Sequence, residues 1–136
     1  MIDDLVSPEV IDYYPPLKRV CQYVEMNYKD KITLTTVSDF AGFERSYFSS
    51  YFSTKTGVTF TEYLRHYRIM KSKELIESSD HTMIYVCHEV GFNDYHSFYR
   101  SFKVFTDMTP IEYKKSVIDS MNPITYVLKG TPAETL

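Results

Sequence analysis

Four side chains in the last third of the chain have the chemistry to contact a nucleic acid. They are polar or basic and share one arc of a helical wheel drawn at roughly 100° per residue: His96, Tyr99, Arg100 and Lys103. An arginine can pair bidentately with guanine or bind a phosphate, and a lysine supplies a point charge for phosphate. Histidine and tyrosine can do either or stack on a base. The arc therefore suits contact with DNA.

The segment that carries this arc is the second copy of a repeat. Residues 91–113 read GFNDYHSFYRSFKVFTDMTPIEY and residues 42–63 read GFERSYFSSYFSTKTGVTFTEY, with most matches about fifty residues apart. A period of this size usually marks one supersecondary unit that has been copied, and two copies are too few for an open solenoid. The sequence therefore predicts two similar units.

The two copies share their inward-facing pattern and differ in their outward-facing one. In the first copy the wheel assigns the aromatic side chains Tyr47, Phe48, Tyr51 and Phe52 to the core, and in the second it assigns Phe98, Ser101, Phe102 and Phe105. Serines occupy the outward positions of the first copy. Alone they would be ordinary solvated surface, but the repeat favours a role shared with the second copy. The candidate DNA-contacting residues are Arg45, Ser46, Ser49, Ser50, Ser53, Tyr95, His96, Tyr99, Arg100 and Lys103.

Helices must position both arcs. In the first copy Thr33 is a good N-cap for a short helix that ends at Gly42, and a longer helix follows to about Lys55, closed by Gly57. A short helix, a tight turn and a longer helix form the helix-turn-helix arrangement, whose second helix can lie in a DNA major groove. The second copy repeats this arrangement from Met83, with Asn93 or Asp94 as the cap of its longer helix.

A long helix of residues 59–79 is expected between the two units. Thr59 and Glu62 form a capping box at its start. At about 1.5 Å per residue it spans roughly 30 Å, close to the roughly 34 to 36 Å between successive major-groove faces of B-DNA. A first helix from Pro15 to about residue 29 covers the first unit, and a last helix from Thr109-Pro110 runs to about residue 117.

These elements predict an all-α fold of about seven helices, with two homeodomain-like helix-turn-helix subdomains joined by a long linker helix. The expected parts are an acidic N-terminal extension (1–14), the first subdomain (15–58), the linker helix (59–79), the second subdomain (80–118) and a C-terminal tail (119–136). In the tail, residues 124–128 are either a short extended segment or disordered.

The charge of the whole chain hides an uneven distribution. The formal net charge is −3 and the pI is about 5.8. The two tails are acidic, however, and residues 15–118 carry fourteen Lys and Arg against twelve Asp and Glu, a net charge of +2. This balance permits nucleic-acid binding, because a local basic stripe matters more than the total charge.

Other classes of function find little support in the sequence. Cys87, His88 and Glu89 are consecutive helical residues that point in different directions, and no second ligand pair stands at metal spacing, so we expect no enzyme, metal or cofactor. Both cysteines, Cys21 and Cys87, lie on faces expected to be buried and are interpreted as small hydrophobes. No apolar run approaches bilayer length and the N-terminus is acidic, so a cytoplasmic location is expected.

From about residue 15 to 118 the chain resembles the DNA-binding domain of the AraC/XylS family of bacterial transcription regulators. The resemblance rests on the Gly91-Phe92 pair, the F-x-x-x-F-K of residues 98–103 and the T-P-x-x-Y of residues 109–113. It implies two recognition helices in adjacent major grooves of double-stranded DNA and an activator that contacts RNA polymerase. Family members often carry a separate effector-binding or receiver domain, but the flanks here are too short for one, so we expect no small-molecule effector within this chain. No membrane partner is expected.

Some residues depart from the family pattern. Glu44 replaces a usual capping serine, which weakens the expected cap and places a negative charge near DNA, and Asp107 replaces a usual glycine. Alanine is common in the family at three further positions, which here are Ser38, Ser72 and Cys87. One branch of proteins that use this DNA-binding module transfers alkyl groups to an exposed cysteine, and the buried position expected for Cys87 disfavours that activity. Two alternatives stay open: the fold can serve as a protein-interaction module, and the chain can be a stand-alone regulator or a fragment of a longer one.

Overall fold

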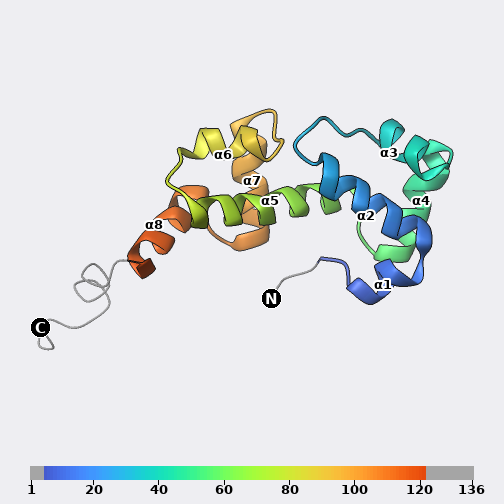
Figure 1. Ribbon diagram of the computed structural model, residues 1–136, viewed down its shortest axis with the longest axis horizontal. Helices are drawn as coiled ribbons and strands as arrows, with labels where there is room; N and C mark the ends of the chain where they lie inside the picture. Colours follow the sequence, from blue (N-terminus) through green and yellow to red (C-terminus); the bar gives the residue numbers. More distant parts are fainter. Residues whose placement is uncertain (1–4, 122–136) are drawn as a thin grey trace, which may run out of the picture.

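The computed structural model describes residues 5–121 and contains, in that range, eight helices and no strand (Figure 1). They are α1 (Pro8–Tyr13), α2 (Pro15–Asn27), α3 (Leu34–Ala41), α4 (Arg45–Thr56), α5 (Phe60–Ser78), α6 (Met83–Glu89), α7 (Tyr95–Thr106) and α8 (Pro110–Met121). The all-α prediction is confirmed. Residues 1–4 of the expected extension and residues 122–136 of the expected tail lie outside the described range.

Helix α1 was not predicted from the sequence. Ser7 is its N-cap and accepts a hydrogen bond from the Val10 amide at 3.3 Å, and Pro8 stands in its first turn. Val6, just before it, is buried in the core of the first unit. The Ser-Pro pair was the local signal, but six residues are too few to show a helical period.

Helix α5 connects two lobes, one at each end (Figure 1). The first lobe comprises α1–α4 and the N-terminal half of α5, and the second comprises α6–α8 and the C-terminal half. Phe60, Tyr63 and Leu64 of α5 enter the core of the first lobe. Ile69 and Ile76 enter the core of the second lobe. The buried side chains of α5 therefore belong to the first core up to Leu64 and to the second core from Ile69 onward.

Local signals place the turns of both helix-turn-helix units. Gly42 and Gly57 have φ of 79° and 82°, the left-handed conformation that a residue without a Cβ adopts at least cost. Asp107, which replaces the usual glycine, adopts the same region with φ of 61°. The predicted capping boxes at Thr59–Glu62 and Thr109–Glu112 are both formed.

Glu44 caps α4 although it replaces the usual serine. It is the N-cap of α4, and its carboxylate accepts a hydrogen bond from the Tyr47 amide at 3.1 Å. A longer side chain than serine therefore still reaches the unpaired amides of the first turn, and its charge faces the positive end of the helix dipole. The cap is therefore formed, a cap weaker than that of serine stays a prediction, and the negative charge remains at this position.

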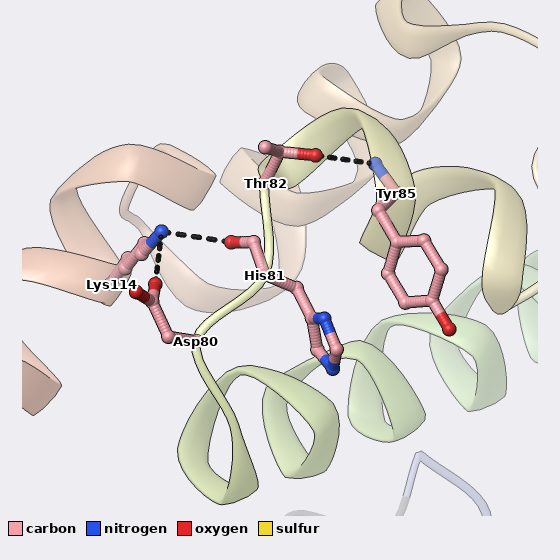
Figure 2. A network of polar contacts seen from close by, with 5 residues as sticks. All are labelled: Asp80, His81, Thr82, Tyr85 and Lys114. Atoms are coloured by element: carbon pink, nitrogen blue, oxygen red, sulfur yellow. Dashed lines mark hydrogen bonds and ion pairs between the residues drawn. The ribbon is translucent and has the colours of Figure 1, made fainter.

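The loop between α5 and α6 is tied to α8 (Figure 2). Lys114 Nζ donates to the His81 carbonyl at 2.8 Å and lies 3.0 Å from Asp80 Oδ1. Thr82 Oγ1 accepts from the Tyr85 amide at 3.1 Å and so caps α6. These contacts hold α8 against the loop that follows α5 in the second lobe. Among residues 5–121, no helix has the length and apolar character to cross a membrane.

Candidate nucleic-acid interface

Helix α7 presents the polar arc as the wheel predicts. Phe98 and Phe102 are fully buried, whereas His96, Tyr99, Arg100 and Lys103 are exposed. Arg100 Nη1 lies 3.5 Å from His96 Nε2, one turn earlier. Tyr95 is half-buried, with its ring centroid 5.7 Å from that of Phe98 and 6.3 Å from that of Tyr99. It therefore supports the arc from the edge of the core.

Helix α4 exposes a different arc from the one predicted. Its buried side chains are Phe48 and Phe52. Arg45, Ser46 and Ser50 are exposed as expected, but Ser49 and Ser53 are half-buried.

Tyr47 was assigned to the core and is 57% exposed, so that assignment was wrong. The core takes only two side chains from α4, and Tyr47, about 100° around the helix from Phe48, falls outside it. Its ring instead packs edge-on against Phe43 at 5.2 Å. Thr54, on the same side of the helix, is also exposed. Tyr47 and Thr54 thus belong to the outward face of α4, and periodicity alone does not separate such border positions from the core.

The two helices begin with carboxylate caps and differ in basic charge. The Asp94 carboxylate accepts from the Ser97 amide at 2.8 Å, and this hydrogen bond lowers the pKa of Asp94. Helix α7 exposes Arg100 and Lys103, whereas α4 exposes Arg45. The other basic residue of α4, Lys55, is half-buried with Nζ 5.0 Å from the Tyr14 ring centroid. Positive charge is therefore concentrated on α7.

Arg65 of the linker helix was missed as a candidate. It is exposed and lines, together with Arg100 and Ser97, a cavity of about 250 Å³ between α5 and α7. Two guanidinium groups thus line one cavity beside the exposed face of α7. The sequence signal was an arginine in the segment that joins the two units, but its direction depends on how α7 packs on α5.

The described residues offer little to other chemistries. No group of three or more His, Cys, Asp or Glu residues within the described range could hold a metal ion. Cys87 is buried, and burial raises its pKa to about 11. Burial also raises the pKa of Cys21, which is half-buried. Both thiols therefore stay protonated near neutral pH, and a protonated thiol is a poor nucleophile.

Comparison with known proteins places the chain among helix-turn-helix proteins. A family model described as a helix-turn-helix domain matches residues 37–116. An uncharacterized HTH-type transcriptional regulator of Staphylococcus aureus is 32% identical over 98 residues, which are 72% of this chain and 13% of that protein. The transcriptional regulatory protein HptR of S. aureus is 30% identical over 112 residues, 82% of this chain and 43% of that protein. The chain thus spans less than half the length of these relatives.

The fold is also that of solved AraC-type domains. The DNA-binding domain of the global transcriptional factor AdpA, solved in complex with a target DNA, has a TM-score of 0.71 and 21% identity. The match covers 80% of this chain and 96% of that one. Two helix-turn-helix units joined by one helix, and a family model that matches more than half of the sequence, lead to one conclusion: the chain belongs to the AraC/XylS family of helix-turn-helix proteins.

Proposed function

We propose that the chain binds double-stranded DNA in a sequence-specific manner and regulates transcription, with α4 and α7 as its recognition helices. The observation that carries this proposal is that each helix-turn-helix unit presents its second helix on a shared linker: α4 meets α5 near its N-terminal end, and α7 crosses α5 nearer its middle (Figure 1). The 19 residues of α5 span roughly 28 Å, close to the spacing of about one DNA turn between successive major grooves. The relative HptR is named as a transcriptional regulatory protein, and AdpA was solved with its target DNA, which supports this function.

The proposed contacts divide between base readout and backbone binding. Arg100, with His96 and Tyr99, is positioned to read base edges from α7, while Lys103 and Arg65 supply charge for phosphates. On α4, Ser46, Ser50 and Tyr47 fit closely against a groove and add short-range contacts. The functional units proposed are residues 15–58 and 80–118 with the linker 59–79, and α1 adds to the first unit. Activation through contact with RNA polymerase is a further proposal, supported by the family resemblance.

Selection from a random duplex pool, followed by titration of the selected duplex at several salt concentrations, tests this function. We expect binding that weakens steeply as salt rises, since each neutralised phosphate releases counterions. A tight, sequence-selective complex in 50 mM salt that loses most of its affinity by about 200 mM supports the proposal. Absence of any selected sequence, or of binding at low salt, would refute it and would favour the protein-interaction alternative.

A further inference from the structure

The two lobes touch each other directly and not only through α5. After α2, the loop at residues 28–33 leaves the first lobe and crosses to α5 and to the turn between α6 and α7. Tyr28 packs against both hydrophobic cores, and its ring centroid lies 5.3 Å from that of Tyr67 on α5. Lys29 Nζ lies 3.1 Å from Glu89 Oε2 at the end of α6. The loop therefore bridges the lobes.

Arg68 is at the centre of this bridge. It stands on α5 between Leu64, which belongs to the first core, and Ile69, which belongs to the second. Its Nε donates to the Tyr28 carbonyl at 2.8 Å, and its Nη2 donates to the Asp30 carbonyl at 2.9 Å.

Tyr28 is the C-cap of α2, where carbonyl groups lack helical partners and the helix dipole is negative. The guanidinium thus supplies donors and charge that the end of α2 needs.

The second lobe completes the contact through a backbone approach. Gly91 has φ of 102°, and a Cβ built on it would lie 2.4 Å from the Tyr28 carbonyl oxygen and 2.8 Å from Arg68 Nε. The turn at Gly91 therefore lies against the loop and the guanidinium, with no room for a side chain. Helix α7 starts four residues later, at Tyr95, so the position of this turn determines where α7 begins.

We infer that Arg68 fixes the relative orientation of α4 and α7 by holding the end of α2 on α5, where the Gly91 turn packs against both. The inference rests on the proposed function, because it makes Arg68 a positioning residue for binding two major grooves at once. Each core attaches its lobe to one end of α5, and small changes in the bend of α5 would alter the angle between the lobes. A third contact, made directly between them, removes that freedom. The preorganised pair then loses less entropy on binding both half-sites.

A distance measurement tests this inference without DNA. Spin labels at Thr54→Cys on α4 and Val104→Cys on α7, in a background with Cys21→Ser and Cys87→Ala, report the separation of two exposed positions. We expect the distribution of label-to-label distances to be narrow in the wild-type protein and clearly broader in Arg68→Met. Arg68→Lys should give an intermediate width. Lys115→Met, which removes an exposed cation on α8, should leave the width unchanged. Equal widths for Arg68, Arg68→Lys and Arg68→Met would overturn the inference.

DNA binding supplies the second readout. On the selected duplex with both half-sites we expect Arg68→Met to lose about tenfold in affinity, and on a duplex with one half-site scrambled less than about twofold. A merely structural role would lower both affinities together, and that outcome would count against the inference. If Arg68→Met fails to fold, the double variant Lys29→Ala with Glu89→Ala, which removes an exposed and a half-buried residue of the same contact, takes its place. We expect it to broaden the distance distribution slightly, and an unchanged width would also overturn the inference. Failure of the wild-type protein to bind any duplex would refute the proposed function and leave the distance result standing.

Discussion

Replacing Gly91 with alanine should cost far more stability than replacing its repeat equivalent, Gly42. Both residues follow the first helix of a helix-turn-helix unit and both have positive φ, 79° at Gly42 and 102° at Gly91. A Cβ at Gly42 meets nothing within 4 Å, so Gly42→Ala carries only the backbone cost of about 1 kcal/mol. This variant is the matched control.

At Gly91 the new Cβ would meet the Tyr28 carbonyl oxygen at 2.4 Å. An ordinary contact between carbon and oxygen is about 1 Å longer, so the loop or the turn must move and the Arg68 hydrogen bonds must lengthen. Adding an overpacking cost of roughly 1 to 3 kcal/mol to the backbone cost gives a total of about 3 kcal/mol. The substitution therefore disturbs the bridge as well as the turn.

Urea unfolding followed by far-UV circular dichroism measures the difference, and the absence of tryptophan makes this the practical probe. The expected order of unfolding free energy is wild type, then Gly42→Ala, then Gly91→Ala. The difference between the two variants should be about 2 kcal/mol. Equal losses in the two variants would show that the close approach of Tyr28 to Gly91 does not contribute to stability. The proposed contact between the lobes at Arg68 and Gly91 would then be refuted as well.

Three further predictions concern the surface and the buried thiol. Arg100→Ala should weaken DNA binding by about 1 to 3 kcal/mol if Arg100 reads a guanine, and Ser50→Ala by less; equal losses in a duplex titration would contradict the asymmetry between α7 and α4. Glu44→Ser keeps a capping side chain and removes a charge, so thermal unfolding should change little while DNA binding tightens at low salt and the gain shrinks at high salt. Because burial raises the pKa of Cys87 from 9.0 to about 11, folding favours the protonated thiol, and the free energy of unfolding should fall as pH rises between those values. The free energy of unfolding should fall less over this pH range in Cys87→Ala. Parallel pH profiles of the wild type and the variant would refute this prediction.

What the sequence could predict was local, and what it missed depends on contacts between distant residues. The capping boxes at Thr59 and Thr109 and the left-handed turn at Gly42 each depend on neighbours within four residues, so residue type alone identifies them. The Arg68 contacts join residues 38 and 40 positions apart. On a helical wheel Arg68 is one more basic residue on a polar face, and only the packing of the loop after α2 shows its role.

Border positions were the other source of error. Tyr47 and Ser97 occupy equivalent places in the repeat, yet Tyr47 is exposed and Ser97 is half-buried beside Arg65 and Arg100. The difference arises because α7 crosses α5 and contacts it more extensively, whereas α4 meets α5 near one end. The repeat therefore predicts the core of each unit, and the surroundings of each unit decide which neighbouring positions reach the surface.

The two copies differ in the energy that each can supply to DNA binding. In α4 the basic side chain of Lys55 lies over the Tyr14 ring, so the exposed face carries one cation, Arg45, against the carboxylate of Glu44. In α7, Arg100 and Lys103 are exposed and Arg65 of α5 lies near Arg100, and these cations also stand against one cap carboxylate, that of Asp94. Because the salt-dependent part of affinity follows the number of phosphates neutralised, we expect the larger share of it from the second lobe. The first lobe then contributes through shape and short-range contacts, which add to affinity only if the orientation of that lobe is fixed. Arg68 and the Gly91 turn supply that orientation.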